Sequence, residues 1–382
     1  MIIQSENVWI ASQFIPAQIE IEEQKIKRVY PYGTHPVDVD YQDHKIVPGF
    51  IDIHIHGGYG IDTNDATFDE MVTLTQKLPS EGVTSFLPTT VTQTEEVLMR
   101  ALKNVAEVKQ QQNSGTQILG VHFEGPYLNI DFKGAQPGEC IIKPDVKQFK
   151  RFYEASGELI RVITLAPEKD IDYELMDFCN THNIVVSQGH SGANYEETLM
   201  GIANGVKSIT HVFNGMSRFH HRDVNLTGAA FRAKDVFGEI IVDGVHSNFS
   251  NVHTFMTTKG KERAILITDA LLGKGEPVGS EYQFGGHPVR VFEDGSLRLL
   301  DLDAIAGSTL LSNRGVQNII EKVGLDWEYA VNASSLNPAR LLGVDDHKGY
   351  IKATYDADLA ILDKNFDVVA TYILGKCEYS KQ

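Results

Sequence analysis

Cysteine is scarce in this 382-residue chain, which contains only Cys140, Cys179 and Cys377. Three scattered thiols without a Cys-x-x-Cys pair exclude a disulfide framework and favour reduced cysteines in a cytoplasm. The chain also lacks any apolar run near the roughly 20 residues that span a bilayer. Residues 1–10 lack the basic stretch and long apolar run of a signal peptide. We therefore expect a soluble, cytoplasmic protein without a membrane partner.

Basic residues are few as well, since 34 Lys and Arg stand against 51 Asp and Glu and give a net charge of −17. Phosphate backbones and anionic membranes bind to basic surfaces, so this charge argues against a nucleic-acid partner. One small phosphorylated ligand in a local pocket remains compatible with it. The apolar fraction of 42% is ordinary for a globular α/β protein.

Two kinds of apolar pattern divide the chain. Near both ends, short segments alternate with a period of two, which is typical of small antiparallel strands. We predict that residues 1–46 and 349–382 together form one small β-sandwich domain. The segment between them, residues 47–348, is predicted to be the catalytic domain.

Within the middle segment, apolar runs alternate with helical patterns such as residues 95–111 and 196–203. Near-continuous apolar strands separated by helices indicate a parallel sheet covered on both faces. Eight such units over about 300 residues favour a (β/α)8 barrel over a doubly wound sheet. The candidate strands are residues 50–55, 83–87, 118–123, 159–165, 184–187, 208–212, 240–242 and 264–267.

Residues able to bind a metal or transfer a proton follow six of these strands: His54 and His56, Glu124, His190, His211, His246 and Asp269. The carboxyl ends of barrel strands share one mouth, so these side chains should converge. Imidazole and carboxylate groups suit a divalent metal, for which we expect Zn²⁺, with Fe²⁺, Mn²⁺ or Co²⁺ as alternatives, at one or two ions per subunit.

We predict one ion between Glu124, His190 and His211 and a second at His54 and His56, which point to the same face of their strand. Asp269 would be the base, because a carboxylate beside a metal-activated water can accept its proton. Each signal is weak alone, since a single strand-end histidine is more often a hydrogen-bonded core residue and Asp269 could simply cap a helix. The joint placement at six strand ends favours the metal site.

The same segments resemble a known family. The sequence VPGFIDIHIHG at residues 47–57 resembles the first-strand signature of the amidohydrolase superfamily. Within that superfamily the chain resembles the N-acetylglucosamine-6-phosphate deacetylases from about residue 45 to 362. The segments that carry this likeness are 120–126, 189–191, 210–216, 242–246, 266–270, 306–308, 337–340 and 349–358.

The resemblance implies a metal-dependent homodimer that converts N-acetyl-D-glucosamine 6-phosphate to D-glucosamine 6-phosphate and acetate, in amino-sugar catabolism or cell-wall recycling. It implies Glu124, His190 and His211 as metal ligands and Asp269 as the catalytic residue. It also implies a set of sugar and phosphate contacts: Ala135, Gln136, Asn214, Gly215, Arg222, His246, Ile305, Ala306 and Gly307.

Two departures from the family pattern bear on mechanism. Some relatives lack the first-strand histidine pair and hold one metal, whereas this chain keeps His54 and His56 and resembles the two-metal members. Some relatives carry a histidine after the Lys-Gly-Ala segment to polarise the amide carbonyl, where this chain has Gln136. We hypothesise that the second metal takes over that polarisation.

Two rival interpretations stay open at this point. Another amidohydrolase, such as a dihydroorotase or an acylated amino-acid hydrolase, would usually bridge two metals with a carboxylated lysine on strand four, but residues 161–165 (RVITL) contain none. A non-catalytic relative used as an interaction scaffold would usually have lost metal ligands, and here the full set is present.

Overall fold

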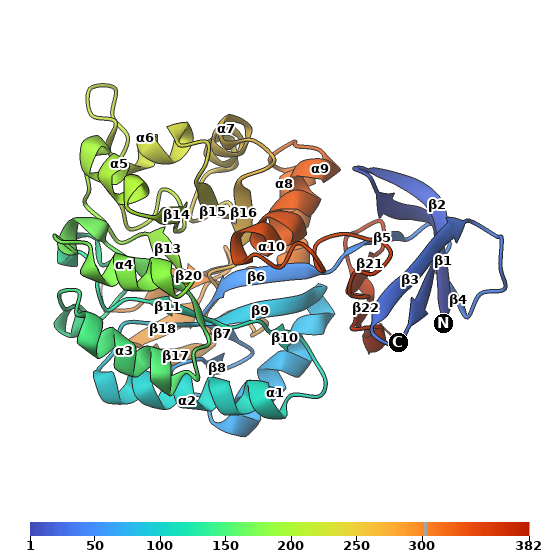
Figure 1. The fold of residues 1–382 in the computed structure, drawn as a ribbon, viewed down its shortest axis with the longest axis horizontal. Helices are drawn as coiled ribbons and strands as arrows, with labels where there is room; N and C mark the ends of the chain where they lie inside the picture. Colours follow the sequence, from blue (N-terminus) through green and yellow to red (C-terminus); the bar gives the residue numbers. More distant parts are fainter. Residues whose placement is uncertain (302–303, 382) are drawn as a thin grey trace.

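The computed structural model describes residues 1–301 and 304–381, which form a barrel with a separate sheet beside it (Figure 1). Each barrel strand pairs in parallel with the next, in the order β6-β9-β11-β12-β13-β14-β15-β16, and the short β10 (Gln117–Ile118) also pairs with β9. The barrel strands are β6 (Phe50–Ile55), β9 (Val83–Thr90), β11 (Val121–Glu124), β12 (Ile160–Leu165), β13 (Val185–Gln188), β14 (Val206–Ile209), β15 (Phe237–Ile241) and β16 (Ala264–Ile267).

The barrel is closed between its first and last strands by backbone hydrogen bonds just beyond β16. The Asp269 N–H donates to the His54 carbonyl over 2.9 Å, and the His56 N–H donates to the Ala270 carbonyl over 2.9 Å. These bonds hold Asp269 directly beside the two histidines of β6.

Helices surround the barrel (Figure 1). Helix α2 shows why these segments are helical. Thr94 caps its first turn, and the buried Leu98, Leu102 and Val105 recur at helical spacing on the face toward the strands. The helices are α1 (Phe68–Lys77), α2 (Glu95–Gln111), α3 (Val146–Ala155), α4 (Glu174–Thr181), α5 (Tyr195–Ala203), α6 (Asn225–Arg232), α7 (Phe249–Lys259), α8 (Ser312–Glu321), α9 (Trp327–Val331) and α10 (Asn337–Leu342). Short turns of helix lie at η1 (Leu78–Glu81), η2 (Ile130–Phe132), η3 (Gly138–Cys140), η4 (Pro167–Lys169) and η5 (Asn332–Leu336).

Both chain ends contribute to the second sheet, and both termini lie there (Figure 1). Its strands are β1 (Ile2–Ile10), β2 (Gln13–Glu22), β3 (Lys25–Pro31), β4 (Val39–Asp40), β5 (Lys45–Pro48), β21 (Leu359–Leu362), β22 (Val368–Ile373) and β23 (Lys376–Ser380). The two ends meet where β21 pairs antiparallel with β5. The predicted fold class, a barrel with a small β domain from both ends, is confirmed; the limits 1–46, 47–348 and 349–382 stay a prediction.

A further antiparallel sheet lies between β16 and α8 and was not predicted from the sequence. It consists of β17 (Glu281–Phe284), β18 (His287–Val291), β19 (Ser296–Leu299) and β20 (Ala304–Ser308). Its inner face forms a small apolar cluster with Leu271 and Leu272, which directly follow the last barrel strand. The sheet is therefore anchored beside the carboxyl ends of the barrel strands. A two-stranded hairpin, β7 (Gly57–Gly58) with β8 (Ile61–Asp62), follows β6.

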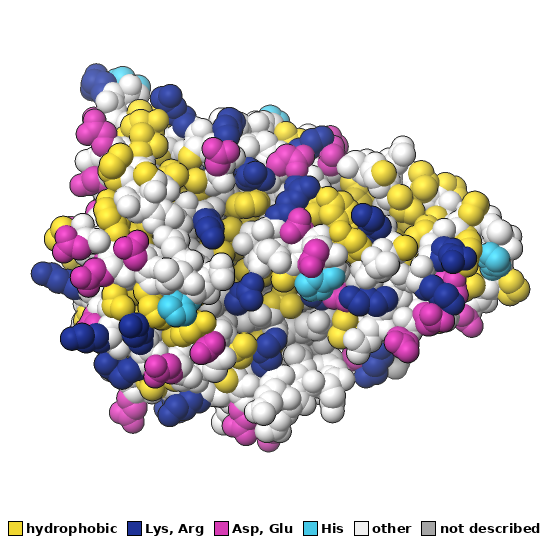
Figure 2. All heavy atoms as spheres, in the orientation of Figure 1, with side chains coloured by type: hydrophobic (Ala, Val, Ile, Leu, Met, Phe, Trp, Pro, Cys, Tyr) yellow, Lys and Arg dark blue, Asp and Glu magenta, His cyan; other side chains and the backbone are white. Residues whose placement is uncertain are grey.

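Charge is mixed over the surface. On the face shown in Figure 2, acidic and basic side chains are interspersed, with apolar side chains scattered between them. Among the described helices, none has both the length and the apolar character needed to cross a membrane.

Candidate active site and metal centre

The structure brings together the residues predicted to bind metal or to act on substrate: His54 and His56 on β6, Glu124 at the end of β11, His190 after β13, His211 after β14 and Asp269 after β16. All are buried except Asp269, whose side chain is 13% exposed. Parallel strands of one barrel end at a common rim, so residues more than 200 positions apart in sequence become neighbours.

One group of potential ligands consists of Glu124, His190 and His211. Glu124 Oε1 lies 3.4 Å from His190 Nε2 and 3.2 Å from His211 Nε2, and the two Nε2 atoms are 3.1 Å apart. Tetrahedral ligands about 2.0–2.1 Å from a zinc ion are about 3.3 Å from one another. The spacing of these three atoms therefore fits one divalent cation.

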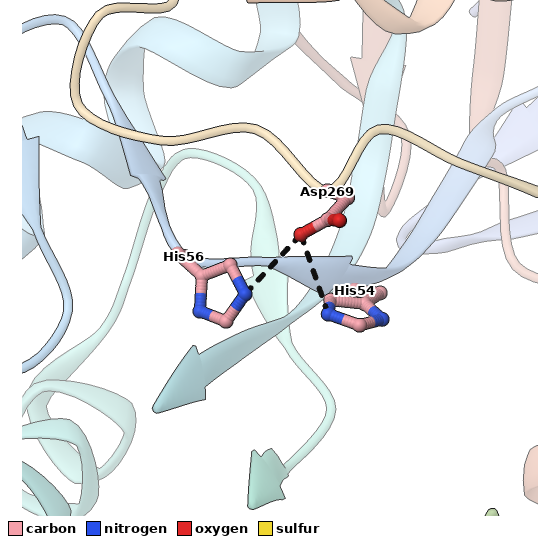
Figure 3. A group of neighbouring side chains, drawn as sticks. All are labelled: His54, His56 and Asp269. Carbon is pink, nitrogen blue, oxygen red and sulfur yellow. Dashed lines mark ion pairs between the residues drawn. The ribbon is translucent and has the colours of Figure 1, made fainter. Parts of the chain in front are cut away.

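The second group consists of His54, His56 and Asp269. Figure 3 shows both imidazole rings directed toward the Asp269 carboxylate, whose Oδ1 lies 3.5 Å from His54 Nε2 and 3.2 Å from His56 Nε2. Glu124 joins the groups, because its Oε1 is 3.4 Å from His54 Nε2 and its Oε2 is 3.3 Å from His56 Nε2.

Unsatisfied polar atoms support the fit to a cation. Among the described residues, His54 Nε2 and Glu124 Oε1 are fully buried without a hydrogen-bond partner. Buried polar atoms are normally paired, since leaving one unpaired costs about 1–3 kcal/mol. Both atoms lie among the other potential ligand atoms, so a divalent cation would satisfy them.

The backbone is strained at three of these residues. His190, His211 and Asp269 have positive φ angles of 45°, 27° and 47°, a region that residues other than glycine rarely adopt. Each turns the chain sharply where a strand ends, which directs its side chain into the mouth. Strain of this kind clusters at functional sites.

The outer ring nitrogens of His54, His56 and His190 are held by hydrogen bonds that leave each Nε2 facing the centre. His56 Nδ1 lies 3.2 Å from the Thr89 carbonyl oxygen, and His190 Nδ1 lies 2.9 Å from that of Phe132. His54 Nδ1 lies 3.0 Å from a carboxylate oxygen of Glu239. Such contacts fix the ring orientation of metal-binding histidines.

The ionisable side chains of this centre shift one another's pKa values. Burial alone would raise the pKa of Asp269, but the neighbouring His54 and His56 outweigh it and lower that pKa to about 2. Burial would lower the pKa of His56, but its hydrogen bonds to Asp269 and Glu124 raise that pKa to about 9. The carboxylates thus strongly favour positive charge between them, which is the electrostatic environment of a cation site.

A cavity of about 160 Å³ opens beside the cluster. Seven of the predicted substrate contacts line it: Ala135, Gln136, Asn214, Gly215, His246, Ile305 and Ala306. Gly134 and Phe284 line it as well and were not predicted. Phe284 belongs to the sheet that the sequence analysis missed, so no contact could be assigned to it in advance.

Two predicted contacts lie outside this lining. Arg222 is exposed in the loop between β14 and α6, and Gly307 is buried behind Leu271. A Cβ on Gly307 would lie 2.7 Å from Leu271 Cγ, so close packing accounts for a glycine there. The roles of both residues in substrate binding remain predictions.

Gln136 has a defined orientation at the edge of the cluster. Its Oε1 accepts a hydrogen bond of 2.8 Å from the Thr92 N–H, and its Nε2 donates one of 2.7 Å to Glu124 Oε2. The amide therefore orients a potential metal ligand besides lining the cavity.

His122, which the sequence analysis left out of the ligand set, is occupied elsewhere. Its Nδ1 lies 3.1 Å from the Ile53 carbonyl oxygen and its Nε2 lies 2.7 Å from the Thr164 hydroxyl. Burial lowers the pKa of His122 well below its usual value. The neutral ring then donates to the carbonyl and accepts from the hydroxyl.

A family model and individual relatives both match most of this chain. Residues 46–377 match the sequence model of the amidohydrolase family. The N-acetylglucosamine-6-phosphate deacetylase of Bacillus subtilis is 38% identical over 340 residues, which cover 88% of this chain and 85% of the relative. The N-acetylgalactosamine-6-phosphate deacetylase of Escherichia coli is 34% identical over 366 residues, 94% of each chain.

Solved structures show the same likeness in three dimensions. A variant N-acetyl-D-glucosamine-6-phosphate deacetylase of Mycobacterium smegmatis, in complex with N-acetyl-D-glucosamine 6-phosphate, superposes with a TM-score of 0.94 at 29% identity and covers 100% of this chain and 99% of its own. The N-acetylglucosamine-6-phosphate deacetylase of Thermotoga maritima gives a TM-score of 0.89 at 32% identity, with 100% of both chains covered. The likeness therefore extends over the barrel and the small sheet together.

Proposed function

The chain belongs to the amidohydrolase family, and from that premise we propose that it hydrolyses the acetamido group of N-acetyl-D-glucosamine 6-phosphate to D-glucosamine 6-phosphate and acetate. The resemblance predicted from the motifs is confirmed by relatives of that activity. The observation that carries the proposal is the convergence of two ligand groups, one of which includes Asp269, beside a cavity of about 160 Å³.

Asp269 transfers the proton in this reaction. A bound divalent cation would lower the pKa of water and stabilise negative charge on the carbonyl oxygen. Asp269 lines the cavity beside the imidazole ligands, and its carboxylate accepts the proton of the attacking water. As the carbon–nitrogen bond breaks, Asp269 gives that proton to the departing amine, which leaves as a neutral amine rather than as an amide anion.

The remaining residues hold the cation and the sugar. Glu124, His190 and His211 would hold the first cation, and His54 and His56 would hold a second. We propose that a second cation held by His54 and His56 would supply polarisation of the amide carbonyl, which would account for the glutamine at position 136.

The phosphate side of the substrate is assigned to His246, Arg222 and the Asn214–Gly215 turn. His246 Nδ1 lies 2.6 Å from an Asp243 carboxylate oxygen, which leaves Nε2 to face the ligand. The Asn214 N–H already donates to the His211 carbonyl over 3.0 Å. The Gly215 N–H has no acceptor among the described contacts, and such a backbone donor suits a phosphate oxygen.

Metal identity, assembly and location complete the proposal. Mixed imidazole and carboxylate donors support Zn²⁺, with Fe²⁺, Mn²⁺ and Co²⁺ as alternatives. A homodimer in the cytoplasm follows from the family resemblance. Exposed Leu199 and Met200 on α5 and exposed Phe219 before α6 offer apolar surface for a partner subunit.

The decisive experiment measures acetate release. We expect turnover of N-acetyl-D-glucosamine 6-phosphate, at least 100-fold lower kcat/KM for the unphosphorylated sugar, and loss of activity with a chelator that Zn²⁺ restores. Because one relative is a galactosamine enzyme, the C4 epimer N-acetyl-D-galactosamine 6-phosphate is the matched comparison. A higher kcat/KM for that epimer would reassign the substrate, and no acetate from either would end the proposal.

A further inference from the structure

Glu239 lies behind the metal centre and takes no part in the scheme above. It sits within β15, is completely buried, and places its Oε2 3.0 Å from His54 Nδ1. The same oxygen accepts a second hydrogen bond of 3.4 Å from the His211 N–H. Glu239 therefore touches one residue from each of the two ligand groups.

The contact determines which nitrogen of His54 can bind a cation. A carboxylate only accepts hydrogen bonds, so His54 must carry a proton on Nδ1. In the neutral ring, Nε2 then holds the lone pair, and it faces Glu124 Oε1 at 3.4 Å and Asp269 Oδ1 at 3.5 Å. The ring is thus fixed in the tautomer that binds a metal through Nε2.

His54 differs from the other ligand histidines in the charge of this outer partner. His56 and His190 face neutral carbonyl oxygens at Nδ1, and His211 Nδ1 has no hydrogen-bond partner among the described residues. A carboxylate acceptor makes the imidazole a stronger ligand than a carbonyl does. The geometry therefore strengthens the His54, His56 and Asp269 group in particular.

The buried carboxylates give a separate reason to expect cations at this centre. Three carboxylates, those of Glu124, Asp269 and Glu239, lie within this buried cluster, and within the described chain none of them forms an ion pair with a lysine or arginine. Burying a charge without compensation is costly. One divalent cation leaves the three carboxylates with one negative charge in excess, and two divalent cations leave one positive charge in excess, so the cluster can hold either number.

We propose that Glu239 is a positioning residue that orients His54 and thereby secures a second divalent cation in the His54, His56 and Asp269 group. This inference rests on the metal-dependent activity proposed above. It assigns the preference for two cations to a residue that touches neither substrate nor reacting atoms.

The test compares Glu239→Gln with the wild type in metal binding. Both proteins are stripped with chelator, reloaded with Zn²⁺ alone, and analysed for stoichiometry and affinity by competition with a chromophoric chelator. We expect two ions per wild-type chain. We expect one ion of unchanged affinity in Glu239→Gln, with a second bound about 10–100-fold more weakly.

Two further variants separate a specific role from general damage. Glu239→Asp keeps the charge and should recover part of the second-site affinity, which a mere packing role would not predict. Surface variant Glu281→Gln should bind both ions as the wild type does. Should Glu239→Gln fail to fold, nitrogen NMR of His54 in the Zn²⁺-loaded wild type gives an independent result, since the proposal requires a neutral ring with its proton on Nδ1.

The outcomes keep this inference apart from the proposed function. Two ions bound by Glu239→Gln with wild-type affinity, a wild-type stoichiometry of one, or a His54 of the Zn²⁺-loaded protein that carries its proton on Nε2 and not on Nδ1 would each overturn it. A wild type that binds two ions in a Glu239-dependent way but releases no acetate would overturn the proposed function alone.

Discussion

Single residues at the barrel mouth are held in conformations that their sequence neighbours alone would not produce. Asp269 has a positive φ, its N–H is bonded to the His54 carbonyl, and its carboxylate faces both histidines of β6. Because three separate constraints converge on this residue, small changes there should alter chemistry more than stability.

Replacing Asp269 by Asn should therefore remove the proton acceptor while keeping the size of the side chain. We expect turnover to fall by a factor of about 10²–10⁴, because general acid–base catalysis contributes this much. The cation held by Glu124, His190 and His211 should remain. Steady-state kinetics and metal analysis check this together, and near-normal turnover would contradict the role of Asp269.

His246 gives a prediction about pH. Burial would lower the pKa of His246, but its hydrogen bond to Asp243 raises that pKa above the usual value. The protonated ring that would bind the phosphate is thus fully present at low pH and is lost as the pH rises through the elevated pKa. The KM for the phosphorylated sugar should then rise at alkaline pH.

Asp243→Asn removes the carboxylate that raises the pKa of His246, whereas burial, which lowers that pKa, remains. The rise in KM should therefore begin at lower pH. We expect a KM about tenfold above wild type at neutral pH, since a hydrogen bond to a charged group is worth about 1.5–3 kcal/mol. The unphosphorylated sugar serves as the control. An unchanged pH profile would show that His246 does not bind the phosphate.

At the scale of elements, the barrel strands were predictable because they are buried on both faces, so that each appears in the sequence as a nearly continuous run of apolar residues. The bounds predicted for β6 and β16 agree with the structure, as do those of α2. The ligand residues could be found because they interrupt these runs at one end. Their pairing into two groups follows from strand order, which a barrel imposes.

The β17–β20 sheet was missed although signals for it exist. Gly285-Gly286 and Asp294-Gly295 are hairpin turn sequences flanked by short alternating segments. Only packing against Leu271 and Leu272 makes such short strands stable, and that contact cannot be predicted from the sequence of the strands themselves. Glu239 carried a signal as well, since a charged residue inside a buried strand needs a partner, but its partner lies 185 positions away.

Phe284 tests the role of this sheet. It is 4% exposed, lines the cavity, and its ring centre lies 6.3 Å from that of His56. Phe284→Ala should cost about 3–5 kcal/mol of local packing, as for other buried aromatics. Because the barrel does not depend on this ring, the loss should appear as faster amide exchange within β17–β20 and a roughly tenfold lower kcat/KM, with metal content unchanged.

The exposed Val278, just before β17, provides the matched control, because Val278→Ala should change neither amide exchange nor kinetics. If Phe284→Ala behaved in the same way, the sheet would have no part in forming the cavity.

For the molecule as a whole, a buried charge cluster joins the barrel to the small sheet. Lys348 is 4% exposed, and its Nζ lies 2.9 Å from an Asp356 oxygen and 2.6 Å from an Asp358 oxygen. Asp358 also accepts hydrogen bonds from Gln117 of β10 and from the Leu374 N–H that follows β22. The cluster therefore bonds to both parts at once.

Lys348→Met should lower the free energy of unfolding by about 3–5 kcal/mol, because it leaves the buried Asp358 without its cation, while Asp356 keeps only its pair with Lys25. Urea unfolding followed by fluorescence is a suitable measurement, since Trp9 in β1 and Trp327 in α9 both pack on Phe14 near the junction. Lys376→Met should change stability by only about 0–1 kcal/mol, since the Lys376 side chain, which pairs with Glu378, is 64% exposed.

The same pair of variants yields a pH prediction. Burial would lower the pKa of Lys348, but Asp358 and Asp356 raise it. The stabilisation is then fully present below the pKa of lysine in the unfolded chain, about 10.4, and is lost as the pH rises through the higher folded value. The alkaline decline in stability should be shallower in Lys348→Met than in Lys376→Met.

The antiparallel pairing of β5 with β21 has a consequence for biosynthesis. About 300 residues separate these strands, so the ribosome releases β5 long before β21 exists. Throughout elongation the edge of β5 is open to other nascent chains, which is a known route to aggregation. Premature termination within the last 30 residues should therefore send the product to insoluble material, even though every ligand of the centre has already been translated.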